Sequence, residues 1–134
     1  GTDIDGSLGT VPGLDPTNPA ASAMAKIGEA NGFAGGDAFV GESYDAAALM
    51  LLAMASAKSS DPQVYKDHIM KVANGTGEKI YPGELAKGIK LASYGVAIDY
   101  VGASSVSLIG PGEAAGNFRE IQIQNGKMVD VNYR

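Results

Sequence analysis

The sequence contains no cysteine, no tryptophan and only one histidine, His68. Without cysteine the chain has no disulfide, no thiolate nucleophile and no cysteine-ligated zinc. A metal site or catalytic triad built on His68 needs partners that the surrounding spacing does not show. No nucleophile beside a base and no pair of carboxylates at an interpretable spacing stands out either. We therefore expect a protein that is not an enzyme and has no catalytic residues, metal or cofactor.

Basic residues and long apolar runs are also scarce. Ten Lys and Arg stand against fifteen Asp and Glu, for a net charge of -5. Because the basic residues are scattered, they form no stripe that could neutralise a phosphate backbone, and we expect no nucleic-acid partner. The longest apolar run, residues 46–55, is shorter than the ~18 residues of a membrane span and suits a buried helix.

Apolar residues make up 45% of the chain, and 19 Gly and 6 Pro interrupt them frequently. This content can supply a core, and the frequent breaks favour short elements joined by many turns. The fold class predicted from composition is α/β.

Two helices are predicted from a capping side chain followed by proline, at Asn18-Pro19 and Asp61-Pro62. The cap accepts a bond from an early amide, and proline is tolerated at the first helical position because its missing N–H has no partner there. We expect these helices to end at residues 31–32 and 74–75. A further helix is expected between about residues 84 and 95.

The strongest helix is predicted from Ser43 or Tyr44 to about residue 58. Asp45 would lie in its first turn, where capping and the helix dipole favour a carboxylate. The segment is apolar all round, so several of its faces must be covered. We expect its Leu49, Met50 and Leu52 to be largely buried.

Short strands are predicted at residues 7–12, 97–101 and 105–109, followed by a loop over residues 110–116. Period-two alternation on both sides of Asn125-Gly126 predicts a β-hairpin, because both central positions of a type I′ turn need positive φ. Its buried faces would carry Ile121, Ile123, Val129 and Val131.

These elements do not complete an α/β domain. Covering the helices requires a parallel sheet, and one early strand with a late hairpin supplies little of it. We infer that upstream sequence belongs to the same fold. The uncovered apolar faces would then be covered either by that upstream part or by self-association of the chain.

Four segments, in order, resemble the last third of the type 1 periplasmic binding proteins, in particular the branched-chain amino acid group that serves ABC transporters. They are Glu-Ser-Tyr-Asp-Ala-Ala at residues 42–47, Tyr-Pro-Gly-Glu-Leu at 81–85, Ile-Asp-Tyr-Val-Gly-Ala-Ser at 98–104, and the hairpin around 124–127. The stretch from residue 105 to 113 departs from the family's usual turn.

This resemblance implies two α/β lobes, joined by three crossover strands, that close on a ligand between them. The chain would be a fragment of that fold. Residues 1–13 would be a strand of the C-terminal lobe, residues 14–116 part of the N-terminal lobe, and residues 117–134 a hairpin returning to the C-terminal lobe.

The implied function is capture of a branched-chain amino acid or a similar small polar solute, such as an amide, in the periplasm for delivery to a membrane permease. A ligand-sensing regulatory or receptor domain of the same fold is the alternative. The resemblance places ligand contacts at Phe39 and the nearby Glu42. The other interpretation of these two residues is a core Phe39 and a solvated Glu42.

Overall fold

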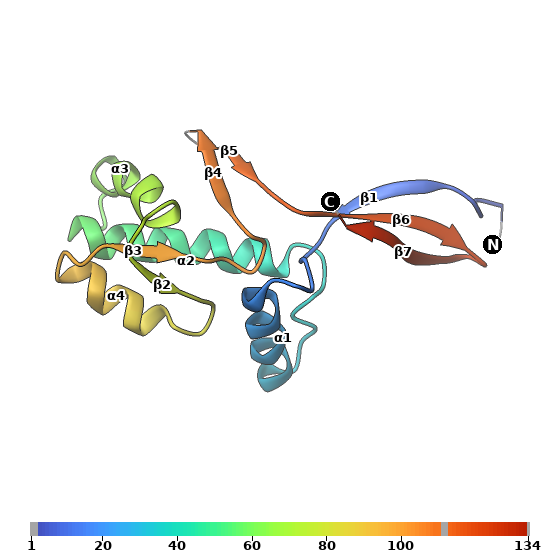
Figure 1. Cartoon of the computed structure of the whole chain (residues 1–134), viewed down its shortest axis with the longest axis horizontal. Helices are drawn as coiled ribbons and strands as arrows, with labels where there is room; N and C mark the ends of the chain where they lie inside the picture. The colour runs from blue at the N-terminus through green and yellow to red at the C-terminus, as the bar shows by residue number, and fades with distance from the viewer. Residues whose placement is uncertain (1–2, 111–112, 134) are drawn as a thin grey trace.

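The computed structural model describes residues 3–110 and 113–133, and its mixed helices and strands confirm the α/β class (Figure 1). The helices are α1 (Pro19–Asn31), α2 (Val40–Ala57), α3 (Pro62–Ala73) and α4 (Leu85–Ser93). The strands are β1 (Leu8–Pro12), β2 (Glu78–Ile80), β3 (Ile98–Tyr100), β4 (Ser107–Gly110), β5 (Glu113–Ala115), β6 (Phe118–Gln124) and β7 (Lys127–Tyr133).

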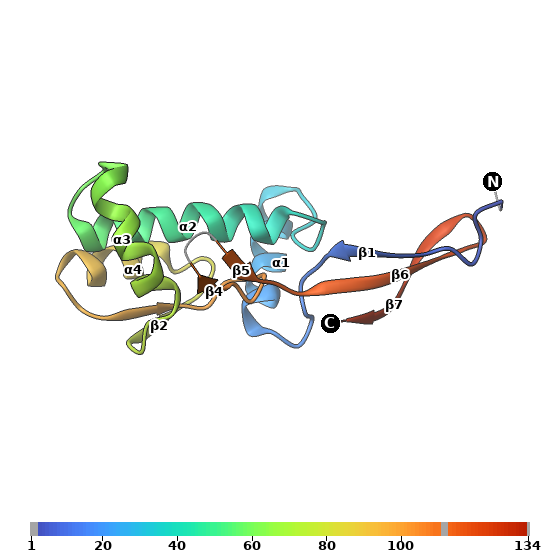
Figure 2. The same cartoon turned by 90° about the horizontal axis from the view of Figure 1, so that it is seen from above.

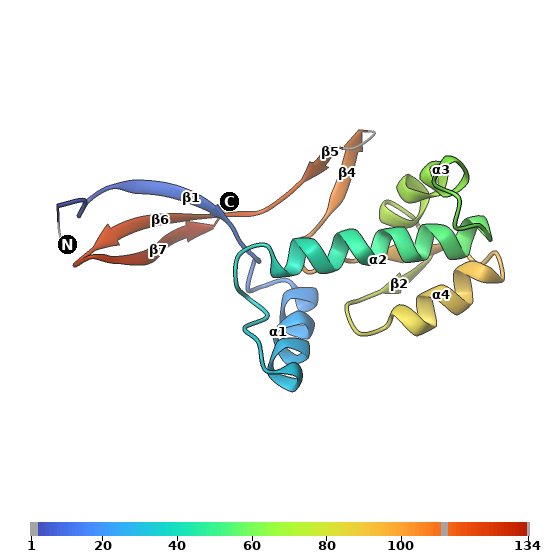
Figure 3. The same cartoon turned by 180° about the vertical axis from the view of Figure 1, so that it is seen from behind.

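The molecule is elongated, with a helical body at one end and a three-stranded sheet at the other (Figure 1). The helical body contains α2, α3, α4 and the parallel pair β2–β3, and α1 lies between the two ends. Helix α2 runs along the body behind β3 in Figure 1 and in front of β2 in Figure 3. Strands β4 and β5 form an antiparallel hairpin that projects from the body.

The caps of α1 and α3 confirm the two proline-containing helix starts. The side chain of Asn18 accepts a 2.9 Å bond from the Ala20 amide, and that of Asp61 accepts a 2.9 Å bond from the Gln63 amide. Helix α1 ends as predicted at Gly32, whose φ of 76° is left-handed.

Helix α2 differs from its prediction at the N-terminus. It begins at Val40, three residues before Ser43, because Phe39 takes a left-handed conformation with φ 69° and its carbonyl accepts the Ser43 amide. Asp45 therefore lies inside the helix and not in its first turn.

Helix α2 packs against α3 and α4, and its side chains on those faces are buried. Leu49 and Leu52 are buried as predicted, but Met50 is 42% exposed and that prediction is wrong. The reason is that the two helices and the β2–β3 pair leave one stripe of α2 uncovered. The core cluster consists of Ala48, Leu49, Leu52, Ala53, Val72, Ala73, Ile80, Ala92, Ile98 and Tyr100.

The three-stranded sheet has the order β1-β6-β7, all antiparallel. Asn125 and Gly126 have φ of 52° and 72°, which confirms the type I′ turn between Gln124 and Lys127. The carboxylate of Asp5 accepts both turn amides, at 2.9 Å from Asn125 and 2.8 Å from Gly126. This contact attaches the segment before β1 to the hairpin.

The burial predicted for the hairpin is only partly correct. Ile121 is buried and Ile123 is half-buried, but Val129 and Val131 are exposed. All seven residues of β7 are exposed because no described segment covers that strand beyond its pairing with β6.

The prediction of a loop over residues 110–116 is also partly wrong. Glu113–Ala115 forms β5 and pairs with β4, while Pro111 and Gly112 lie outside the described residues.

Two segments connect the sheet to the rest of the molecule, one after β1 and one before β6 (Figure 2). They lie side by side, since the Gly13 amide donates a 3.3 Å bond to the Asn117 carbonyl. Among the helices of the described residues, none has the length and apolarity needed to cross a bilayer.

Candidate binding site

A cavity of about 350 Å³ lies at the N-terminal end of α2. Its walls come from α2, the β4–β5 hairpin and the two segments that connect the sheet to the helical body. Both sequence-predicted site residues, Phe39 and Glu42, line it. Most of the remaining wall is apolar and includes Leu49, Val106, Leu108 and Phe118.

Phe39 stands at this cavity with 62% of its surface exposed, so it is not a core residue. Its left-handed backbone ends the preceding turn and starts α2 directly. Few non-glycine residues adopt such a conformation without support from their surroundings, and a bulky side chain there is unusual. The exposed ring is therefore held at the rim of the cavity by the turn that begins the helix.

Glu42 lies in the first turn of α2 and is partly buried, so it is not simply solvated. Its Oε2 atom is buried and has no hydrogen-bond partner in the structure. A buried carboxylate oxygen without a donor is unfavourable, because it has lost water and gained nothing in exchange. Among the described residues, no Lys, Arg or His lines the cavity.

Asp45, one turn further along α2, is a second cavity-lining carboxylate, and sequence reasoning missed its role. It is only 1% exposed and accepts four hydrogen bonds. Oδ1 accepts the Tyr100 hydroxyl at 2.7 Å and the Ala103 amide at 3.0 Å. Oδ2 accepts the Ser104 amide at 2.8 Å and the Ser104 hydroxyl at 2.7 Å.

A sequence signal for this role does exist. Asp45 precedes Ala48, Leu49 and Leu52 by three, four and seven positions, so it shares their buried face once the helix is extended to Val40. A carboxylate on an apolar face requires dedicated donors. Its interpretation as a helix cap hid this requirement.

Burial raises the pKa of Tyr100 above its usual value, and the negative charge of Asp45 raises it further. The phenol therefore stays protonated and serves as a donor to Asp45. The turn after β3 consequently has a fixed partner on α2.

The same turn is held from the opposite side by Asn18, which also caps α1. Its Nδ2 atom donates to the Gly102 carbonyl at 3.1 Å and to the Ser105 hydroxyl at 2.8 Å. Residues 102–105 are thus anchored to two helices. These hydrogen bonds hold Ser104, the residue of this turn that lines the cavity, in place without a ligand.

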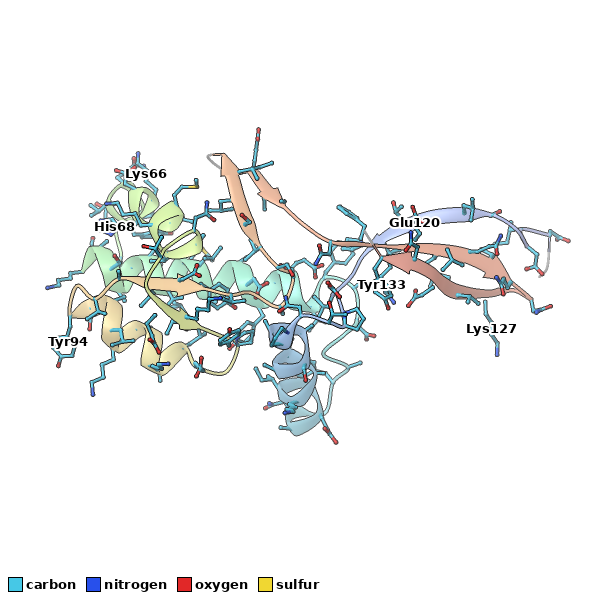
Figure 4. All side chains as sticks on the ribbon, in the orientation of Figure 1. Lys66, His68, Tyr94, Glu120, Lys127 and Tyr133 are labelled. Atoms are coloured by element: carbon cyan, nitrogen blue, oxygen red, sulfur yellow. The ribbon has the colours of Figure 1, made fainter. Side chains whose placement is uncertain are left out.

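Ser56 and His68 form a polar pair that does not line this cavity. Ser56 Oγ and His68 Nδ1 are 2.9 Å apart, and His68 lies on α3, far along the molecule from Lys127 at the tip of the sheet (Figure 4). In the ranges that the structure describes, no three His, Cys, Asp or Glu side chains are grouped to hold a metal ion.

Comparisons with protein-family models, with curated protein sequences and with solved structures found no match. An apolar wall, an exposed aromatic ring and one carboxylate oxygen without a donor suit the binding of a small molecule.

Proposed function

We propose that this chain is part of an extracytoplasmic solute-binding protein of an ABC transporter, which captures a branched-chain amino acid or a similar small polar solute in the periplasm. The observation that carries the proposal is the position of the cavity. It lies where two connecting segments pass between the helical body and a separate sheet, and it contains Phe39 and Glu42.

This position suits ligand-driven closure. Small-molecule sites form preferentially between bodies that can move relative to one another. The segments at Gly13 and Asn117 are joined by one backbone hydrogen bond, so two short stretches of chain can absorb a rotation. A solute that contacts both sides binds the closed state more tightly and shifts the population toward it. The closed form is the one that the membrane permease recognises in this proposal.

The exposed sheet supports the fragment interpretation of the fold. Leu8, Met128 and Val131 are 75%, 70% and 49% exposed, so both edge strands, β1 and β7, leave large apolar side chains uncovered. In the proposed two-lobed fold, β1, β6 and β7 belong to one lobe, whose remaining strands and helices cover this surface. The segment from residue 14 to 116 belongs to the other lobe.

Thermal-shift and calorimetric titration of the full-length protein with amino acids, aliphatic amides and urea tests this function. A binding solute raises the melting temperature, because it stabilises the folded state by RT ln(1 + [L]/Kd). We expect leucine-sized solutes to bind, and Phe39→Ala to weaken their binding. The proposal is wrong if no solute in the panel binds at millimolar concentration.

A further inference from the structure

We propose that Glu42 recognises a positively charged nitrogen on the solute, so that the cavity selects small aliphatic ammonium compounds over anions with the same aliphatic group. This inference rests on the proposed function, because it names the chemical class that the same site takes. It is based on the different hydrogen bonding of the two carboxylates at the cavity, Asp45 and Glu42.

The two carboxylates differ sharply. Asp45 is saturated by four donors from the protein, whereas Glu42 Oε2 is buried with none. The surroundings of Glu42 in the cavity are largely apolar, with Leu49, Val106 and Phe118 on the wall. A carboxylate in such surroundings needs a donor, and a positively charged donor gives a hydrogen bond roughly twice as strong as a neutral one.

Among the residues that the structure describes, no cation of the chain fills this role. Arg119 follows the cavity-lining Phe118 on β6, but successive side chains of a strand point to opposite faces. The Arg119 guanidinium instead forms a 3.1 Å ion pair with Asp130 and lines a different hollow, beside Leu14 and Tyr133. The described residues thus supply Glu42 with no positive charge, which leaves the ligand as its source in this proposal.

A purely structural role for Glu42 also fails to account for the geometry. A glutamate in the third helical position can reach back to the amide of the N-cap residue, here Phe39, in a capping box. Oε2 of Glu42 makes no such bond. The favourable effect of the helix dipole on a first-turn carboxylate does not require the oxygen to be buried beside a cavity.

The resulting ligand has two parts. Its aliphatic group lies against the apolar wall and the ring of Phe39, and its ammonium group donates to Glu42. A neutral amide with the same aliphatic group can donate a weaker bond. A carboxylate in that place meets the negative charge of Glu42 and is repelled.

Calorimetric titration of the full-length protein with three probes that share a 3-methylbutyl group tests this inference. The probes are 3-methylbutylamine, 4-methylpentanamide and 4-methylpentanoate at pH 7. We expect the amine to bind at least about 10-fold more tightly than the carboxylate. Glu42→Gln should weaken the amine about 10-fold or more and leave the amide within about 3-fold. The matched control is Glu113→Gln, which removes the same charge from an exposed site on β5.

The outcomes separate this inference from the proposed function. Leucine binding with equal affinity for the amine and the carboxylate would overturn the role of Glu42 and leave solute binding intact. An unchanged amine affinity in a folded Glu42→Gln protein would do the same. If Glu42→Gln does not fold, the ranking of the three probes by the unaltered protein still decides the question. Absence of binding by the amino acids, amides and all three probes would reject both proposals.

Discussion

The hydroxyl of Tyr100 donates a 2.7 Å hydrogen bond to Oδ1 of Asp45, although the two residues are 55 positions apart in the sequence. The bond joins the end of β3 to the middle of α2 inside the core. It also places the turn after β3 against the cavity, since the next residues of that turn bond to the same carboxylate. Core stability and the shape of the cavity wall therefore depend on one side chain.

Replacing Asp45 by Asn should reduce the free energy of unfolding by about 3 kcal/mol, because a buried charged acceptor is lost and its donors are left unpaired. The amide can keep an oxygen toward Tyr100, but its NH₂ group then faces the two donors of Ser104. Urea denaturation measures the loss. Asp67→Asn, at an exposed position of α3, is the control. A loss below about 0.5 kcal/mol would mean that the four bonds are dispensable.

Tyr100 should make the protein less stable at alkaline pH. A tyrosine in the unfolded chain ionises near pH 10, whereas burial and Asp45 hold the pKa of folded Tyr100 above that value. Above about pH 10 the unfolded state therefore binds fewer protons, and unfolding becomes easier by up to about 1.4 kcal/mol per pH unit. Denaturation at several pH values measures this slope, which Tyr100→Phe should remove. An equal slope in both proteins would contradict the assignment.

Adjacent leucines of α2 should respond differently to truncation. Leu52 is fully buried and Leu51 is 44% exposed. Leu52→Ala leaves a core cavity and should cost about 2–5 kcal/mol. Leu51→Ala should cost less than about 1 kcal/mol. Similar losses in urea denaturation of the two variants would show that α2 is oriented differently.

Phe39 offers a way to separate backbone strain from ligand contact. Phe39→Gly and Phe39→Ala both remove the ring, but only glycine adopts the left-handed conformation without steric cost. We expect the glycine variant to be more stable than the alanine variant by about 1 kcal/mol. Both should lose solute affinity equally in calorimetry. Higher affinity in the glycine variant would indicate that the turn, and not the ring, serves binding.

Sequence reasoning succeeded where the signal is local. The caps at Asn18 and Asp61 and the turn at Asn125-Gly126 depend on residues within three positions of one another, and each formed as predicted. A capping side chain or a positive φ requirement acts independently of the rest of the fold.

Sequence reasoning failed where contacts between distant segments determine the structure. Strand β2 was not predicted, because its three residues become a strand only by pairing with β3, about twenty residues later. Gly77 allows that pairing, since a side chain there would meet the Ala97 carbonyl. The early start of α2 likewise depends on Gly41, which packs against Leu14.

The residues of the site likewise divide into those that were predicted from the sequence and one that depends on distant partners. Phe39 and Glu42 were predicted from a resemblance, and the structure places both at one cavity. Asp45 was missed because its partners come from β3 and the turn after it, and no local pattern links them to α2.

The pairing of β1 with β6 sets an order of events for folding. Hairpin β6–β7 has its own turn and can form within about 1–10 μs. Strand β1 reaches β6 only by closing a loop that contains all four helices of the described residues. Closing this loop costs conformational entropy, and the contacts between β1 and β6 offset that cost only after the loop has closed. Folding of the helical body brings Gly13 to Asn117 and shortens the remaining search. Strand β1 is therefore the last element to join, and slow maturation of the sheet after the helices have folded is its kinetic signature.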